Sequence, residues 1–131
     1  MSFKLINPGA LGAPSGYSHG VAVPAGQLLF IAGQIAVDQD NRIVSDDIVE
    51  QFDRALGNVV VVLEAAGGKP EHVTRFVIYV TDKIAYRERR KEIGQVYRRH
   101  MGKHFPAMVL VQVAGLLEDA AKVEIEATAV L

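Results

Sequence analysis

Hydrophobic and polar residues alternate along several short stretches of the chain, as they do in half-buried β-strands. The predicted strands are residues 18–23, 27–37, 73–81, 107–114 and 122–131, with a shorter candidate at 42–44. Pro24-Ala25-Gly26 has the length of a hairpin turn, so we expect the first two strands to pair with each other.

Two other stretches repeat their apolar residues at helical spacing. The first contains Ile48, Phe52, Ala55, Leu56, Val59, Val60 and Leu63, and the second contains Tyr86, Ile93, Val96, Tyr97 and Met101. Ser45-Asp46-Asp47 offers several possible N-caps for the first helix, and Gly67-Gly68 a stop. Its β-branched run 59–62 has low helix propensity, so burial against a sheet must hold it helical. Gly102 ends the second helix, whose outer face is basic.

The predicted order is therefore β-β-(β)-α-β-α-β-β, an α+β arrangement. The 131 residues suit one domain, 1–131, because no stretch resembles a linker. Residues 1–16 hold several Pro and Gly residues and predict an extended, turn-rich N-terminal arm.

Several predicted strands are apolar on both faces. In 107–113 one face carries Ala107, Val109, Val111 and Val113, and the other carries Met108, Leu110 and Gln112. Such a strand must be buried on both sides, whereas two helices cover only one side of a sheet. At roughly 25 cal/mol per Å² an exposed second face would forfeit several kcal/mol. A second copy of the chain is the simplest cover, so the pattern predicts a homo-oligomer.

Composition narrows the class of protein. The chain has no cysteine, which excludes disulfides, thiolate catalysis and Cys-ligated metal. There is no signal-like segment and no run of eighteen apolar residues, so we expect a cytoplasmic protein that neither enters nor crosses a membrane. The net charge of −1 makes nucleic acid an unlikely partner on global electrostatics.

The last predicted strand places Glu124 and Glu126 on one face, roughly 7 Å apart. If partly buried, such a pair would raise the pKa of one carboxyl and make it a proton donor. A solvated strand face is the alternative, and it weakens if that face lies inside an oligomer.

Other candidate groups are weaker. Ser18 and His19 would point to opposite sides of a strand, so they do not form a nucleophile and base pair. His100 and His104 have the i, i+4 spacing of a metal pair, but Gly102 lies between them and no third ligand is evident. The basic segment 83–104 lacks interleaved aromatics on its outer face, which favours a solvated helix over a nucleic-acid surface.

A series of motifs together resembles the Rid family (reactive intermediate deaminase, also called YjgF or L-PSP proteins). They are GYSHGV at 16–21, FIAGQI at 30–35, LEAAGG at 63–68, YVTD at 79–82, FPAMVLVQV at 105–113 and VEIEATAV at 123–130. The resemblance implies a chorismate-mutase-like fold, a mixed sheet with two helices on one face. It also implies a trimer with sheets inward and small-molecule sites in the clefts between subunits.

The best-known members hydrolyse enamine and imine intermediates to 2-oxo acids and ammonia without a cofactor. By motif, Tyr17 would be the cleft tyrosine, Glu124 the carboxylate that positions water, and Gly33 a backbone contact to substrate. Leu110 lies where a backbone amide would meet the substrate carboxylate, and Gln112 is a further candidate lining residue. No metal or other cofactor is implied.

One position departs from the pattern. Deaminating members carry an arginine after the Pro-Ala of this motif, where a bidentate salt bridge holds the substrate carboxylate, and here the residue is Met108. A thioether cannot replace that bridge, although Arg75 on a neighbouring strand could supply a charge. Two alternatives to an imine hydrolase therefore stay open. One is a non-catalytic small-molecule binder or chaperone-like trimer, and the weaker one is an endoribonuclease that depends on Arg98 or Arg99.

Overall fold

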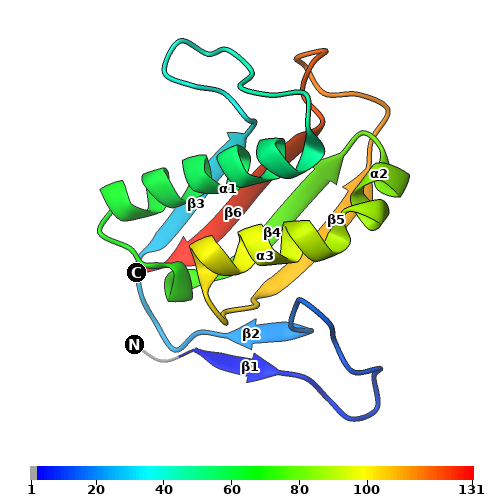
Figure 1. Cartoon of the computed structure of the whole chain (residues 1–131). Coiled ribbons are helices and arrows are strands. Elements are labelled where there is room, and N and C mark those ends of the chain that lie inside the picture. Colours follow the sequence, from blue (N-terminus) through cyan, green and yellow to red (C-terminus); the bar gives the residue numbers. More distant parts are fainter. Residues whose placement is uncertain (1–2) are drawn as a thin grey trace.

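The computed structural model describes residues 3–131, which are built around a four-stranded sheet in the order β3-β6-β4-β5 (Figure 1). The strands are β3 (Leu28–Gln34), β4 (Val73–Val80), β5 (Ala107–Gln112) and β6 (Val123–Val130). β6 runs antiparallel to both of its neighbours, whereas β4 and β5 are parallel. The sheet is therefore mixed, as the family resemblance implies, and the strands expected at 73–81, 107–114 and 122–131 are confirmed.

The first predicted helix is confirmed as α1 (Ile48–Ala65). Asp47 caps it by accepting a hydrogen bond from the Glu50 backbone N–H, and Gly67 follows its end with a positive φ of 85°, which glycine adopts without strain. A short 3-10 helix, η1 (Pro70–His72), then leads into β4.

The second predicted helix is divided in two, as α2 (Lys83–Glu88) and α3 (Arg90–Met101). Asp82 caps α2 by accepting from the backbone N–H groups of Ile84 and Ala85. At the junction, the Arg89 guanidinium donates to both Asp47 and Glu92, which ties the break to the start of α1. No helix in residues 3–131 is long and apolar enough to cross a membrane.

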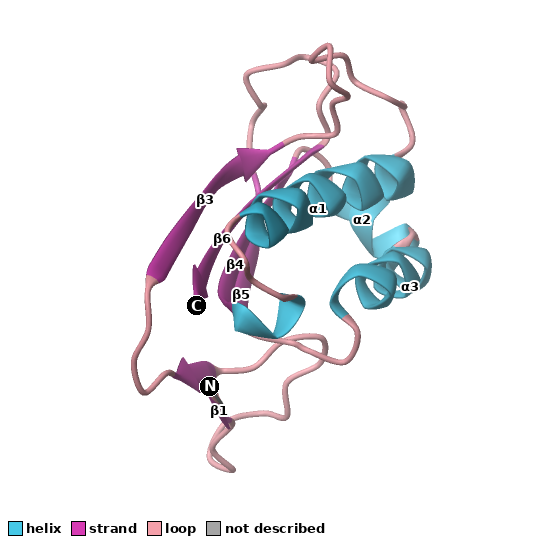
Figure 2. Ribbon diagram, turned by 90° about the vertical axis from the view of Figure 1, so that its left-hand side faces the viewer, coloured by secondary structure: helices cyan, strands magenta, loops and turns pink. Residues whose placement is uncertain are grey.

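The core lies between the sheet and helices α1 and α3, which cover one face of it (Figure 2). Its largest fully buried side chains include Phe52 and Leu56 of α1, Phe76 of β4 and Ile125 of β6. No segment of the described chain covers the opposite face of the sheet, where Phe30 is 74% exposed and Leu28, Val109 and Val111 are also exposed. We call this the open face.

The predicted hairpin of 18–23 with 27–37 is wrong. β2 (Gly20–Ala22) pairs with β1 (Lys4–Ile6), so the expected arm contains a strand of its own, while β3 pairs with β6. The backbones of Gln27 and Leu131 exchange two hydrogen bonds, at 2.8 and 3.0 Å, that start the β3–β6 ladder. The long β6 pairs with β3 from Leu28 to Gln34, which the three-residue β2 cannot do. The segment 42–44 contributes a single bridge between Val37 and Ile43.

Candidate functional site on the open face of the sheet

The strand register determines which side chains share the open face. Tyr79 of β4 lies directly opposite Glu124 of β6 on one side and Val111 of β5 on the other. Along β6, Glu124, Glu126 and Thr128 are half-buried, whereas the alternate residues Val123, Ile125, Ala127 and Ala129 are buried against the helices. The predicted two-faced pattern of the last strand is therefore confirmed.

Glu124 extends from β6 over the backbone of β3. A Cβ atom placed on Gly33 would lie 2.5 Å from Glu124 Oε2 and 2.9 Å from its Cδ. The register of β3 against β6 shifts between Ile31 and Gln34, and this bulge brings Gly33 under the carboxylate. Two of the residues singled out from the sequence are thus in direct contact.

Glu126 leans the other way. Its Oε1 accepts a hydrogen bond of 2.7 Å from the Tyr79 hydroxyl on β4. That hydrogen bond, partial burial and the negative charge of both carboxylates raise the pKa of the Tyr79 phenol above its usual range, while Arg75 opposes the shift. The two glutamates of one strand face therefore contact different neighbouring strands. Sequence reasoning gave Tyr79 no role, although it lies on an alternating strand and begins the YVTD motif at 79–82.

Tyr17 lies at the beginning of β5. The next residue, Ser18, is buried and forms a parallel bridge with Ala107. Its hydroxyl donates to the Phe105 carbonyl at 2.7 Å, and its backbone N–H donates to the Pro106 carbonyl at 3.0 Å. The Ser18 hydroxyl is thus a structural donor, which agrees with the weak case for a nucleophile.

His19 fastens the N-terminal loop. Its backbone N–H donates to Asn7 Oδ1 and its ring Nε2 hydrogen bonds to the Gly12 carbonyl, both at 2.8 Å. The Tyr17 ring packs edge-on against the His19 ring, with centroids 5.3 Å apart. These contacts give His19 a structural role and hold the Tyr17 ring in place.

Within one chain the predicted site residues form two separate groups. Tyr17 and Met108 lie at the start of β5, whereas Glu124 and Gly33 lie at the other end of the sheet, two and three strands away from β5. Counting strand spacings and residue rises, Tyr17 and Glu124 are roughly 20 Å apart. One small molecule cannot touch both residues in the same chain.

Met108, Leu110 and Gln112 are on the helix-covered side of the sheet. Register pairs Met108 with Phe76 and Leu110 with Ile78, and both side chains pack against the core. The Gln112 side chain accepts a hydrogen bond of 2.9 Å from the Lys83 backbone N–H at the start of α2. Met108 and Gln112, which the sequence singled out as candidate site residues, therefore do not share a face with the two glutamates, because strand alternation places Val109 and Val111 there instead.

His100 and His104 have different partners. His100 Nε2 hydrogen bonds to Asp53 Oδ1 at 2.6 Å, joining α3 to α1, while His104 Nε2 donates to the Val73 carbonyl at 2.7 Å. Among the described residues, no group of three or more His, Cys, Asp or Glu side chains is arranged to hold a metal ion.

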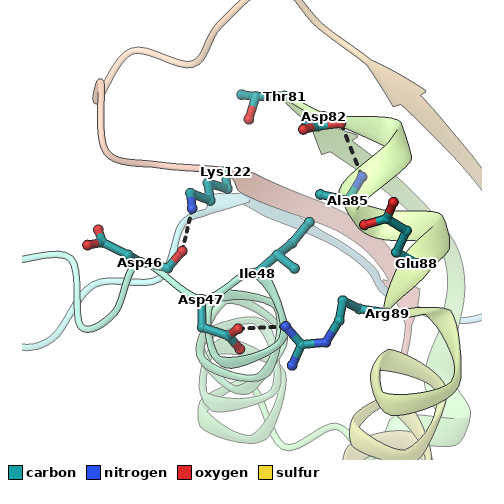
Figure 3. A pocket seen from close by; sticks show the side chains of 9 residues that line it. All are labelled: Asp46, Asp47, Ile48, Thr81, Asp82, Ala85, Glu88, Arg89 and Lys122. Carbon is teal, nitrogen blue, oxygen red and sulfur yellow. Dashed lines mark hydrogen bonds and ion pairs between the residues drawn. The ribbon is translucent and has the colours of Figure 1, made fainter.

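A hollow of about 410 Å³ lies on the helix side, where α1, α2 and the start of β6 meet (Figure 3). Its cations are already engaged, since Arg89 pairs with Asp47 at 2.8 Å and Lys122 Nζ donates to the Asp46 carbonyl. The Arg89 hydrogen bond, with the Glu50 backbone N–H, lowers the pKa of Asp47. The charged residues that line this hollow thus hold neighbouring elements together. The open face is therefore the better candidate for a catalytic site.

The fold and the open face together define a class of small α+β proteins: a mixed sheet with helices on one side and an apolar face carrying carboxylates on the other. The sequence model described as Endoribonuclease L-PSP matches residues 8–131. The chain belongs to this L-PSP family, the Rid family that its motifs resemble.

Relatives and solved structures agree with this assignment. The chain is 38% identical over 109 residues to a RutC family protein of Pyrococcus horikoshii, covering 82% of each chain. It is 32% identical to the 2-iminobutanoate/2-iminopropanoate deaminase of Salmonella typhimurium, covering 99% of this chain and 98% of the relative. The crystal structure of YyfB from Yersinia pestis, a Rid family protein of unknown function, superposes with a TM-score of 0.86 at 32% identity over the full length of both chains.

Proposed function

We propose that this protein hydrolyses a small reactive imine or enamine to a carbonyl compound and ammonia, without a cofactor, in the cytoplasm. The observation that carries the proposal is the contact between Glu124 and Gly33 on the open face. It joins the motif carboxylate to the motif glycine in a chain similar to an imine deaminase.

The proposed site is formed between subunits of a homotrimer. The apolar open face needs a cover, because Phe30, Leu28, Val109 and Val111 are exposed in the single chain. Beyond the Ser18–Ala107 bridge, no strand of residues 3–131 pairs with the outer edge of β5, so the Leu110 region is accessible to a ligand. A second copy that brings its Tyr17 and β5 edge towards Glu124 would complete a site that one chain leaves in two halves.

In the proposed reaction an enamine first tautomerises to the imine. Glu124 then accepts a proton from a water molecule whose oxygen attacks the imine carbon, and return of that proton to the nitrogen gives the carbinolamine. Glu124 next moves the proton of the carbinolamine hydroxyl to the same nitrogen, so the C–N bond breaks, ammonia leaves and the carbonyl forms. Tyr17 would assist from the neighbouring subunit, and the Gly33 and Leu110 backbones would orient the substrate.

Met108 favours a substrate without the carboxylate that an arginine would hold. Its side chain packs against the core on the helix-covered face and offers no charge. The same observation supports a second candidate, a trimer that binds a small molecule without turning it over. Turnover separates the two.

The test is release of ammonia from a panel of imines generated in solution, including 2-iminopropanoate and carboxylate-free imines. We expect turnover of a carboxylate-free imine, and a loss of roughly 10²-fold or more in kcat for Glu124→Gln. Glu118→Gln, a carboxylate in the loop before β6, is the matched control and should behave as the wild type. Unchanged turnover by Glu124→Gln would contradict the mechanism, and no turnover of any imine would favour the binding protein.

A further inference from the structure

We infer that Tyr79 is a positioning residue of this site: by binding Glu126 it holds that carboxylate against β4 and leaves Glu124 as the only free carboxylate beside Gly33. This inference rests on the function proposed above and adds a residue to which no part of that mechanism assigns a role.

The geometry of β6 makes such a device necessary. Glu124 and Glu126 are two residues apart on one strand face, so their backbone positions are roughly 7 Å apart and their flexible side chains can reach each other. Glu124 instead lies over Gly33 on β3, and Glu126 reaches the Tyr79 hydroxyl on β4 at 2.7 Å. The two carboxylates are drawn in opposite directions across the sheet.

Tyr79 reaches Glu126 diagonally. In the β4–β6 register, Tyr79 is opposite Glu124 and Val77 is opposite Glu126, so the Tyr79 ring crosses to the neighbouring position. Arg75 of β4 and Thr128 of β6 also lie on the open face and can donate a hydrogen bond. They are opposite each other in the register, on the side of Glu126 that is farther from Glu124. Tyr79 is thus the donor placed between the two carboxylates.

Separating the carboxylates matters chemically because two close like charges compete for one proton and one water molecule. A base that orients water works best when no second carboxylate can take its place. The Tyr79 phenol holds its proton to a pH above its ordinary range, since Glu126, Glu124 and burial outweigh the opposing effect of Arg75. It therefore remains a donor throughout the neutral range.

The kinetic test removes only the hydroxyl. We expect Tyr79→Phe to lower kcat roughly tenfold with KM changed less than about twofold, because Glu126 is released towards Glu124. In the double variant Tyr79→Phe/Glu126→Ala most of the lost kcat should return, since no second carboxylate remains. Tyr97→Phe is the matched control: it removes a hydroxyl that donates to the His104 carbonyl at 2.6 Å on the helix side, and kcat should stay unchanged. Additive losses in the double variant would overturn the inference.

A crystal structure of Tyr79→Phe gives a readout that does not depend on turnover. We expect the Glu126 carboxylate to leave β4 and approach Glu124 or Gly33. If Glu126 keeps its position without the hydroxyl, Tyr79 does not position it and the inference is wrong, whatever the activity. If the wild type turns over no imine, the proposed function fails separately, and the position of Glu126 still decides the role of Tyr79.

A second variant serves if Tyr79→Phe does not fold. Glu126→Gln lacks the negative charge that competes with Glu124, so it should retain kcat within about twofold, and a larger loss would contradict the inference.

Discussion

The carboxylate of Glu124 occupies the space that a side chain at position 33 would need, since a Cβ there would lie 2.5 Å from Glu124 Oε2. The obstructing atoms belong to the end of a flexible side chain rather than to backbone. A larger residue at position 33 would therefore displace the carboxylate instead of disrupting the sheet, so the glycine fixes the position of a functional group.

Gly33→Ala should consequently reduce activity far more than stability. We expect kcat/KM for the imine to fall by roughly tenfold or more, because Glu124 can no longer lie over β3, while the free energy of unfolding changes by less than about 1 kcal/mol. Steady-state kinetics and urea unfolding at one protein concentration measure the two effects. A variant with normal activity would show that Glu124 does not act from this position.

Phe30→Glu should prevent assembly. Phe30 is 74% exposed on the open face, and a charge there would have to be buried when another copy covers it. We expect light scattering to report a trimer for the wild type and smaller species for the variant. Val61→Glu is the matched control, because Val61 is 64% exposed on α1, away from the open face, and its substitution should leave the mass unchanged. A wild-type monomer would refute the subunit interface and with it the shared site.

Gln51 should be the most sensitive polar residue in the core. It is fully buried on α1, where its amide donates to the carbonyls of Ser45 and Ala120 and accepts from the Lys122 backbone N–H, at 2.7 to 2.9 Å. Gln51→Leu leaves these backbone groups unsatisfied, so we expect a loss of roughly 2–4 kcal/mol in unfolding free energy. Gln39→Leu, in an exposed loop, should change it by less than about 0.5 kcal/mol. Similar values for both would mean that water replaces the lost contacts.

Asp47 should contribute to acid sensitivity. Arg89 and the Glu50 N–H lower its pKa in the folded state, so its stabilisation is present above the unfolded value, roughly pH 4, and is lost as the pH falls through the lowered value. The difference in unfolding free energy between wild type and Asp47→Asn should therefore shrink as the pH is lowered from about 6 to about 3. Asp119→Asn, in the loop before β6, is the control. A difference that stays constant with pH would show that Asp47 acts only as a helix cap.

Hydrophobic periodicity predicted the elements that bury one face against the core. The apolar stripe of α1 from Ile48 to Leu63 and the strict alternation of Val123–Val130 were sufficient to predict these two elements. Burial of one face requires apolar residues at the period of a helix or of a strand. The break at Arg89 was missed because it depends on a contact with Asp47, far away in the chain. The hairpin was misjudged for the same reason, since β3 takes its partner from residues 123–130.

The candidate site was predicted in its parts and not in its arrangement. Motif resemblance singled out Gly33 and Glu124, which the fold brings into contact, but the Tyr79–Glu126 hydrogen bond depends on the β4–β6 register and has no local signature. The face on which Met108 lies depends on how β5 pairs with β4. Alternation in the sequence separated the two faces of β5, but it did not indicate which of them the helices cover.

The position of β6 between β3 and β4 has a consequence for how the chain is made. β6 is the last described strand to leave the ribosome, yet β3 has no other partner in the sheet, and β4 would lie at its edge without it. Until β6 emerges, the apolar residues of β3 remain without a strand partner, although the helices α1 and α3 have already been synthesised. The sheet therefore closes after synthesis has passed residue 123, and chaperone protection of the nascent chain matters most up to that moment.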